Sequence, residues 1–446
     1  MSTKFFIIGL LCLLTPLMVF SQAGHLPVSE EEKKEVIDSV SSILERNYIF
    51  PDVAKEIGTR LKQKWKEKKY ASITDPFEFS RQLTQDIQSV NGDRHLSTRF
   101  DPEGIQLQQT AVNSEDSTTL EERWKRNGQR NNFGFKEVNI LEGNIGYLNL
   151  TEFFDTRYGG ETAQAAMNYL SNTDALIIDL RRNGGGSPSM IQLITSYLYG
   201  PEPVHLNNFY WRPQDLNTQT WTLPYVPGKR RPDIPVYVLT SSQTFSAAEE
   251  FSYNLRNLER ATLVGETTGG GAHPGGPNIA TDRFTVWVAT GRAINPITNT
   301  NWEGVGVKPH LPVLAADAFD VAYLKALDTI KQVVPEYELA GLDWTIAGLK
   351  ADKEKVTVPE KLLRKYAGQY GPRKLTFENG KLYYQRDNRP KTSLKALSKN
   401  LFALEGIPNF RIKMVVEDDE VTAIQGLYQD GRVDLNPREE KKINRP

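Results

Sequence analysis

Ser246 is the residue of this chain best placed for covalent chemistry. It follows an apolar, β-branched run at 236–240, which predicts a buried strand, and precedes 247–258, whose apolar spacing predicts a helix. The free N–H groups and the dipole at a helix N-terminus favour a developing oxyanion, so a serine on this turn is a candidate nucleophile. Ser246 and Glu249 also form a capping-box pattern, which is a purely structural alternative.

A glycine-rich turn offers oxyanion donors for that serine. Asn183-Gly184-Gly185-Gly186 follows the largely apolar run 175–180, which is typical of a strand buried on both faces. The backbone N–H of Gly184 or Gly185, together with that of Ala247, is a candidate donor pair for an oxyanion. Taken alone, the glycines indicate only a tight turn, and neither of the phosphate-binding patterns GxxxxGK[ST] and GxGxxG is present.

Four segments together resemble the tail-specific, or C-terminal processing, serine proteases. The resemblance covers residues 28–335, and the segments occur in the family order. It implies a crotonase-like ββα core with an N-terminal helical cap, an α/β fold, and a peptide or protein substrate. The segments are DLRRNGGG at 179–186, TFSAAE at 244–249, VGETTGG at 264–270 and EGVGVKP at 303–309.

The chain departs from the usual pattern of these proteases at two points. Their lysine base, in GETxxGKG, is replaced here by Gly271, and no lysine occurs between Lys229 and Lys308. The chain also leaves little room for a PDZ domain between cap and core. It therefore resembles the PDZ-less branch, which includes interphotoreceptor retinoid-binding protein, and the core of tricorn protease.

The resemblance to the tricorn type supplies a different base. In that type a histidine after the cap is the base, and a glutamate near the closing motif assists it. These roles correspond to His95 and Glu303 here, which complete a Ser-His-Glu triad with the candidate nucleophile. Alternatives remain for both partners of the serine. His273, near the vacated lysine position, is the alternative base, and Asp93 and Glu249 are the alternative carboxylates.

Two functions of different classes follow from these residues. The first is a secreted serine-type endopeptidase that acts through an acyl-enzyme. The second is a non-catalytic module that holds an apolar, retinoid- or lipid-like ligand on the same fold, as the retinoid-binding relatives imply. The net charge of −1 gives no sign of a nucleic-acid partner. The five histidines lack a ligand spacing such as HExxH, so we predict no metal site, and no cofactor is expected.

The N-terminus has the features of a targeting segment. Lys4 precedes an apolar run at 5–20, which Ser21-Gln22-Ala23 follows, so we predict a signal peptide at 1–23. The run is short for a membrane span. Cys12, the only cysteine, lies within it, so the mature protein would have no disulfide. We expect an exported protein, periplasmic or extracellular, without a stable membrane anchor.

The elements before and around these motifs must position them. Residues 28–98 predict a cap of three helices, which capping and proline signals open. Residues 99–335 predict the catalytic core, with a largely parallel sheet because strand and helix patterns alternate. Within the core, the polar stretch 101–130 predicts a loop, and the proline- and aromatic-rich stretch 201–233 predicts a surface arm.

The last hundred residues differ from the core in their pattern. A largely polar linker is predicted at 336–356. After it, short strand-like runs are joined by Asn379-Gly380 and Asp430-Gly431, which are strong hairpin signals. We therefore predict a small antiparallel β domain at 357–446, with an accessory rather than a chemical role.

Overall fold

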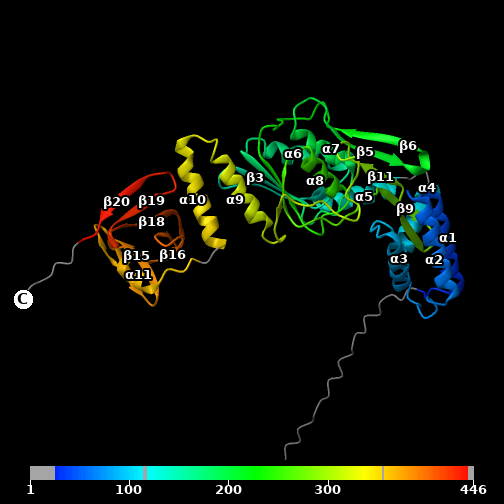
Figure 1. The fold of residues 1–446 in the computed structure, drawn as a ribbon, viewed down its shortest axis with the longest axis horizontal. Coiled ribbons are helices and arrows are strands. Elements are labelled where there is room, and N and C mark those ends of the chain that lie inside the picture. The colour runs from blue at the N-terminus through cyan, green and yellow to red at the C-terminus, as the bar shows by residue number, and fades with distance from the viewer. Residues whose placement is uncertain (1–25, 114–117, 354–355, 440–446) are drawn as a thin grey trace, which may run out of the picture.

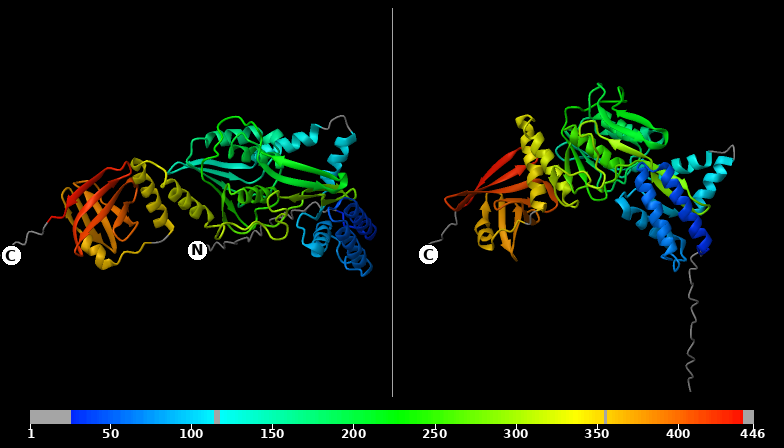
Figure 2. Two further views of the ribbon diagram at one scale, coloured as in Figure 1. Left: turned by 45° about the horizontal axis from the view of Figure 1, so that its top comes forward. Right: turned by 45° about the vertical axis from the view of Figure 1, so that its right-hand side comes forward.

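The chain folds into three parts that lie in a row. The structure, a computed structural model, describes residues 26–113, 118–353 and 356–439, so the predicted signal peptide lies outside the described residues. Figure 1 shows the helical cap at one end, the α/β core in the middle and the β domain at the other end. Both views of Figure 2 keep that order. No helix in the described ranges combines the length and hydropathy that crossing a membrane requires.

The cap is the predicted set of three helices. The helix α1 (Glu30–Asn47) begins at Ser29, whose hydroxyl accepts a backbone N–H of the first turn. Proline at the first helical positions opens α2 (Pro51–Lys66) and α3 (Pro76–Asn91), and the Asp75 side chain also caps α3. These helices bury their apolar faces against one another and against a small sheet.

That small sheet joins the cap to the core. The strand β1 (Ser97–Phe100) pairs antiparallel with β10 (Phe284–Ala289), which pairs with β9 (Gly275–Ile279). Val286 and Val288 on one face of β10 pack into the apolar cluster of the cap. Because β9 and β10 come from the far end of the core sequence, cap and core share this sheet.

The core contains a six-stranded, largely parallel sheet of order β12-β8-β7-β4-β3-β2. Only the predicted hairpin of β2 and β3 is antiparallel. The prediction of a mixed α/β fold is confirmed. The strands are β2 (Phe135–Leu141), β3 (Ile145–Leu150), β4 (Ala175–Asp179), β7 (Val236–Thr240), β8 (Thr262–Gly265) and β12 (Leu311–Pro312).

Helices cover both faces of this sheet, so its central strands are buried throughout. On β4, Leu176 and Ile178 pack into one apolar cluster, and Ala175 and Ile177 pack into another. The first cluster holds α6 (Thr156–Tyr169), α7 (Pro188–Tyr197) and α8 (Ala247–Asn257), and the second holds α9 (Ala318–Ile330).

The prediction of a loop at 101–130 is wrong. This stretch forms α4 (Pro102–Asn113) and α5 (Thr118–Arg130). Its Gln, Glu and Arg residues are good helix formers, and their polarity reflects exposed helix faces rather than irregular backbone. The sequence did contain a start signal, since Asp101 precedes a proline and its side chain accepts the N–H of Gly104 at 3.0 Å.

The predicted surface arm is a hairpin with an added strand. The strands β5 (His205–Trp211) and β6 (Leu216–Trp221) pair antiparallel on either side of a short 3-10 turn, η2 (Arg212–Gln214). The strand β11 (Gly291–Ile294) pairs with β5 on its other side. Another 3-10 turn, η1 (Asn132–Gly134), leads into β2.

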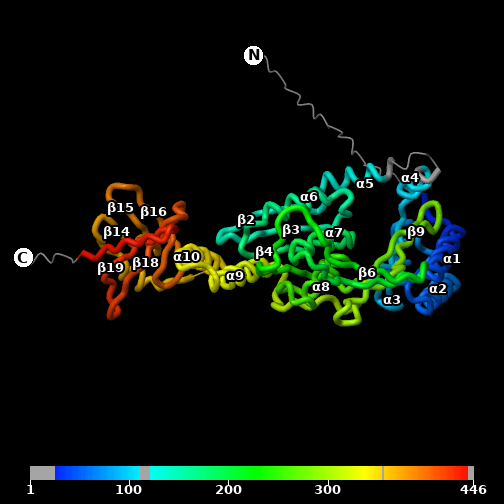
Figure 3. Tube along the Cα trace, turned by 90° about the horizontal axis from the view of Figure 1, so that it is seen from above, coloured from blue at the N-terminus to red at the C-terminus, as the bar shows by residue number. Residues whose placement is uncertain are grey.

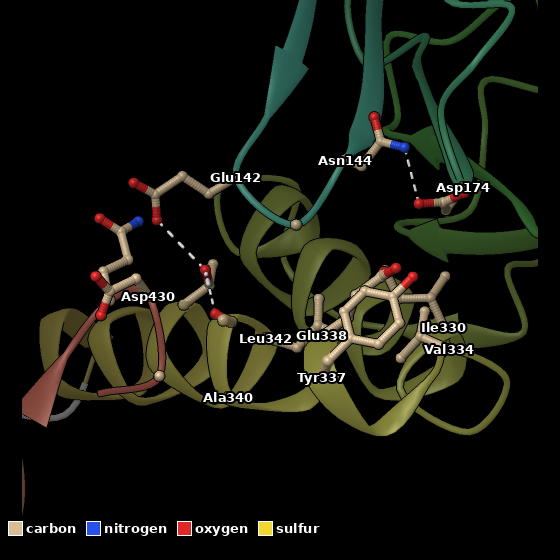
Figure 4. A pocket seen from close by; sticks show the side chains of 15 residues that line it. Glu142, Asn144, Asp174, Ile330, Val334, Tyr337, Glu338, Ala340, Leu342 and Asp430 are labelled. Atoms are coloured by element: carbon tan, nitrogen blue, oxygen red, sulfur yellow. Dashed lines mark hydrogen bonds between the residues drawn. The ribbon is translucent and has the colours of Figure 1, made fainter. Parts of the chain in front are cut away.

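The predicted linker at 336–356 is largely helical, because α10 (Glu336–Lys353) occupies most of it. Its Leu342 and Ile346 face the second apolar cluster of the core, which explains why this mixed sequence is ordered. Seen from above in Figure 3, α9 and α10 connect the core to the β domain. A hollow of 420 Å³ lies where α10 meets the β2–β3 turn and the 429–431 turn. Figure 4 shows side chains that line it.

The predicted C-terminal β domain is an eight-stranded antiparallel meander, in which each strand pairs with the next along the chain. Both predicted turns, Asn379-Gly380 and Asp430-Gly431, connect neighbouring strands. The short helix α11 (Glu360–Tyr366) precedes it. The strands are β13 (Gly368–Tyr370), β14 (Arg373–Glu378), β15 (Lys381–Arg386), β16 (Thr392–Ala396), β17 (Leu401–Leu404), β18 (Ile407–Glu417), β19 (Glu420–Tyr428) and β20 (Val433–Pro437).

Candidate active site

The motif-bearing loops meet at one edge of the core sheet. Asp179 at the end of β4 pairs with Leu239 of β7, and Leu239 pairs with Val264 of β8. Because parallel strands end at the same edge, the loops that follow them converge there. The Phe245 N–H donates to the Asn183 carbonyl at 3.0 Å, which ties the serine loop to the glycine-rich loop.

Ser246 has a strained backbone. Its φ is 54° and its ψ is −121°, a region that residues other than glycine rarely occupy. It stands at the N-cap of α8, and its N–H donates to Glu249 Oε2 at 2.9 Å. With Glu249 it forms the capping box that the sequence predicted. Such strain places the hydroxyl on a sharp strand-to-helix turn, where a nucleophile is typically found.

Glu249 holds this turn in place. Its carboxylate accepts the N–H of Gly270 at 2.6 Å and of Gly271 at 2.8 Å, and the hydroxyl of Thr268 at 2.5 Å. Burial raises its pKa, although these hydrogen bonds favour the charged form. Both carboxylate oxygens are thus occupied by the loop after β8, and Glu249 is a structural brace between two loops of the site.

The glycine-rich loop lies against Ser246. A Cβ added to Gly185, whose φ is 114°, would lie 2.8 Å from the Ser246 Cβ. The Gly185 N–H already donates to Asn183 Oδ1 at 2.9 Å. By contrast, the N–H groups of Gly184 and Ala247 donate no hydrogen bond to any described residue. Of the two glycines that the sequence left open, Gly184 is therefore the one with a free donor.

The two candidate bases, His95 and His273, lie in one cluster. The His95 ring packs against the ring of Phe245, the neighbour of the serine, with 4.7 Å between centroids. Both His95 ring nitrogens are buried and have no hydrogen-bond partner among the described residues. The His95 ring therefore lies beside the serine loop but is not hydrogen-bonded to the Ser246 hydroxyl.

Two carboxylates face these histidines. Asp93 is the nearer to His95, with 3.7 Å from its Oδ1 to His95 Nδ1, while a Glu303 oxygen lies within 4.8 Å of a His95 ring nitrogen. His273 Nδ1 lies 3.2 Å from Asp93 Oδ2 and 3.4 Å from Glu303 Oε2. The structure therefore brings Asp93, which the sequence offered as an alternative to Glu303 for the carboxylate, between the two histidines.

The electrostatics of the two carboxylates differ. Burial raises the pKa of Asp93, but the hydrogen bond from His273 and the nearby imidazole of His95 outweigh it and hold that pKa well below its usual range. Burial raises the pKa of Glu303, and the charge of Asp93 adds to the rise, although His273 opposes it. Asp93 is thus the more firmly ionised carboxylate of the pair.

Further residues support the site without a signal in the sequence. The Tyr48 hydroxyl donates to Asp93 Oδ2 at 3.0 Å, and Asn91 donates to that hydroxyl at 2.6 Å. The Trp302 ring nitrogen donates to the Gly271 carbonyl at 2.7 Å. These partners come from the cap and from the closing motif, and only the tertiary fold brings them together.

A groove of 800 Å³ lies over the small sheet that joins cap and core. Its floor is the face of the small sheet opposite the cap, where Ser97 and Pro277 flank Trp287 across the strands. Trp124 of α5 lines its wall, and the ring nitrogen of Trp287 is buried without a partner in the described ranges. Since β1 starts two residues after His95 and β9 starts two after His273, the groove leads away from the candidate base.

Comparison with known proteins identifies the family. Residues 144–313 match peptidase family S41, and residues 19–127 match the N-terminal domain of this family in eukaryotic IRBP. The core and the cap of this chain thus match two domain models of peptidase family S41. The predicted kinship with the tail-specific proteases and the retinoid-binding branch is therefore confirmed, and so is the prediction of a serine-type peptidase, a hydrolase, at the level of the family. The S41 match spans the serine, the glycine-rich loop and the closing motif.

The solved structures of similar proteins have low sequence identity to this chain. A protein described as an S41 protease from Bacteroides fragilis is 22% identical, with a TM-score of 0.36, and the match covers 43% of this chain and 52% of that one. A peptidase from Parabacteroides merdae is 17% identical, with a TM-score of 0.46, and the match covers 68% of this chain and 99% of that one. Tricorn protease is 14% identical, with a TM-score of 0.43, and the match covers 68% and 37%.

Proposed function

We propose that this S41 chain is an exported serine endopeptidase that cleaves peptide bonds through an acyl-enzyme. Ser246 is the nucleophile, His95 is the base, and Glu303 orients and stabilises the base, as in a Ser-His-Glu triad. The N–H groups of Gly184 and Ala247 bind the oxyanion. The observation that carries the proposal is the strained Ser246 at the start of α8, against the glycine-rich loop. Among the described residues, the N–H groups of Gly184 and Ala247 have no partner.

The reaction follows from these positions. His95 takes the proton from the Ser246 hydroxyl as Oγ attacks the scissile carbonyl carbon, and the carbonyl oxygen becomes an oxyanion between the two N–H groups. When the tetrahedral species collapses, the C–N bond breaks and the amine leaves with the proton from His95. Water, deprotonated by the same base, then attacks the acyl-enzyme and releases the acid and Ser246.

The position of Asp93 supports a shared role for the carboxylates. Asp93 is nearer to His95 than Glu303 is, and its low pKa keeps it charged. An ionised carboxylate beside an imidazole stabilises the imidazolium that forms in the reaction. We therefore assign Asp93 as a second stabilising charge and keep Glu303 as the residue that orients the base. Catalytic hydrogen bonds are often long in unliganded sites and shorten when substrate binds.

The groove supports an extended peptide as the substrate. The groove is open and elongated along the strands of the small sheet, and Ser97 in its lining lies two residues after His95, so an extended peptide bound there could continue toward the site. Trp287→Ala should raise KM for a fluorogenic casein substrate and change kcat little, since it removes binding surface only. Trp221→Ala on the arm, a tryptophan that is 40% exposed, is the matched control.

Two wider assignments belong to the same proposal. The alternation of strands β3, β4 and β7 with helices α6, α7 and α8 supports a crotonase-like core. Lys4 and the apolar run after it support export after cleavage of a signal peptide. Mass spectrometry of the exported protein should find an N-terminus at about residues 22–24. Retention of Met1 would contradict the cleavage.

A serine-directed fluorophosphonate tests the proposal most directly. The wild-type chain should be labelled once, peptide mapping should locate the label at Ser246, and Ser246→Ala should not be labelled. Absence of labelling in the folded wild-type chain would contradict the peptidase. Tight binding of a retinoid or fatty acid by such an unreactive chain would favour the binding module instead.

A further inference from the structure

The cluster beside Ser246 has the composition of a metal site. One ligand atom each from Asp93, His95 and Glu303 lie within 4.8 Å of one another. The pattern of histidines along the sequence excluded such a site, because these residues come from the cap and from the closing motif. The fold gathers them at the end of the groove.

His95 is the unusual member of this cluster. Its side chain is only 8% exposed, and neither ring nitrogen has a hydrogen-bond partner among the described residues. A buried polar group without a partner loses its hydration without compensation, which destabilises the unliganded state. The ring is therefore open to a ligand that accepts an imidazole lone pair, and two carboxylates stand beside it.

We propose that this cluster binds a divalent transition metal of the zinc class, through a ring nitrogen of His95 and one oxygen each of Asp93 and Glu303. Imidazole suits Zn²⁺ and its neighbours better than Mg²⁺ or Ca²⁺, which select oxygen ligands. Three protein ligands leave a fourth position of the tetrahedron for water.

The geometry requires a modest contraction. Bonds of about 2.0–2.1 Å in a tetrahedron separate ligand atoms by about 3.3 Å, so the widest pair must close by about 1.5 Å. Side-chain rotation about His95 and Glu303 supplies such a movement.

The carboxylates already have outer partners. The backbone N–H of His95 donates to Asp93 Oδ1 at 2.9 Å, and the Tyr48 hydroxyl donates to Asp93 Oδ2 at 3.0 Å. The backbone N–H of Ala272 donates to Glu303 Oε2 at 2.6 Å. Outer hydrogen bonds of this kind orient metal ligands and raise affinity. His273 lies on the same two carboxylates and stays an outer partner.

Metal binding would regulate the peptidase. A neutral imidazole has one lone pair, and an ion bound to it keeps the proton on the other ring nitrogen. His95 then cannot accept the Ser246 proton, so metal occupancy and acylation exclude each other. This regulatory step rests on the proposed function, whereas the binding itself does not. Zinc thus acts as a reversible inhibitor that competes at the base, with no bond made or broken in the chain.

The first experiment measures binding without activity. The untagged full-length chain is titrated with Co²⁺, whose visible absorption reports tetrahedral coordination, and Zn²⁺ then displaces it. We expect one ion per chain, and at least a tenfold loss of affinity in His95→Ala and in Glu303→Gln. His205→Ala and Glu137→Gln, which change a histidine and a carboxylate outside the cluster, should bind as the wild type does. No binding, or equal affinity in all variants, overturns the inference.

A second measurement uses only the wild-type chain, in case His95→Ala does not fold. Paramagnetic Co²⁺ should broaden the imidazole resonances of His95 and His273 before those of His205 and His310, and the opposite order contradicts the site. Fluorophosphonate labelling is then compared with and without Zn²⁺. If Zn²⁺ slows the labelling, inhibition is supported. If the labelling rate is unchanged while Zn²⁺ is bound, inhibition is refuted. If the metal-free chain is not labelled, the peptidase proposal fails, and the Co²⁺ titration still decides the metal site.

Discussion

At the scale of single residues, the site concentrates unfavourable local states around one hydroxyl. Ser246 adopts a strained backbone, the ring nitrogens of His95 are buried without a partner among the described residues, and a Cβ on Gly185 would collide with the serine. Each of these states destabilises the folded chain and persists only because the surrounding structure enforces it. Such states are found most often at functional sites. Residue substitutions therefore separate the chemical roles most sharply.

The two histidines should have different effects on acylation. Ser246→Ala and His95→Ala should each slow acyl-enzyme formation by on the order of a thousandfold or more, and the double variant should lose little beyond that, because the residues act as one unit. His273→Ala should cost less, since it leaves the His95 imidazole in place and removes only a partner of the carboxylates. Rates of acyl-enzyme formation measure this. If His273→Ala abolishes acylation while His95→Ala does not, His273 is the base.

Alanine substitutions of Gly185 and Gly184 form a matched pair that tests how closely the glycine-rich loop packs against Ser246. Gly185→Ala adds a Cβ 2.8 Å from that of Ser246, at a φ of 114° that strains any side chain, so it should lower the free energy of unfolding and slow labelling of the serine. A Cβ on Gly184 meets no atom within 4 Å, so Gly184→Ala should keep nearly full stability. Urea unfolding compares the two variants. Equal stability of both would mean that the loop is not held against the serine as described.

At the scale of elements, α8 carries two neighbouring buried carboxyl groups with opposite roles. Glu249 accepts hydrogen bonds from Gly270, Gly271 and Ser246, whereas Glu250 Oε1 has no partner in the described ranges. Burial raises the pKa of Glu250 to about 7, and Asn207 and Asn254 offset only part of that rise. The first group braces the site, and the second destabilises the helix that presents the serine once it ionises.

This difference predicts opposite effects on stability. Between the ordinary carboxyl pKa and about 7, the folded chain binds more protons at Glu250 than the unfolded chain does, so the free energy of unfolding falls as pH rises. Glu250→Gln should therefore be more stable than wild type at about pH 8, and its stability should change less between about pH 5 and pH 8. Glu249→Gln should be less stable at about pH 8, because an amide accepts fewer hydrogen bonds. Urea unfolding at both pH values measures this, and a Glu250→Gln chain that is less stable at the higher pH would contradict it.

At the scale of the whole molecule, α10 is the joint between core and β domain. Leu342 and Ile346 pack into the core, while the Trp344 carbonyl accepts a hydrogen bond from Arg411 at 2.6 Å, and that guanidinium lies 3.8 Å from the centre of the Trp344 ring. The domain boundary therefore falls after α10, at the end of the predicted linker, and not before it. The core needs this helix to cover one face of its sheet.

Two truncations test this boundary. A chain that ends at Lys353 should unfold cooperatively and keep a reactive Ser246, since it retains α10. A chain that ends at Pro335 loses Leu342 and Ile346, each of which contributes about 1.5–3 kcal/mol when buried, so it should be several kcal/mol less stable. Thermal unfolding and fluorophosphonate labelling compare the two. Loss of cooperative unfolding in the longer chain would mean that the β domain is part of the core.

The sequence alone was enough to predict the family, the helical cap, the parallel sheet and the position of Ser246. These depend on local patterns, because strand and helix periodicity, caps and contiguous motifs are written within a few residues. The same reasoning failed at 101–130 and 336–356, where exposed helices have the composition of loops. The strain at Ser246, the free N–H of Gly184 and the approach of Asp93 to His95 and His273 are properties of the tertiary structure. They arise where loops distant in the chain converge at one sheet edge, and no local pattern encodes such contacts.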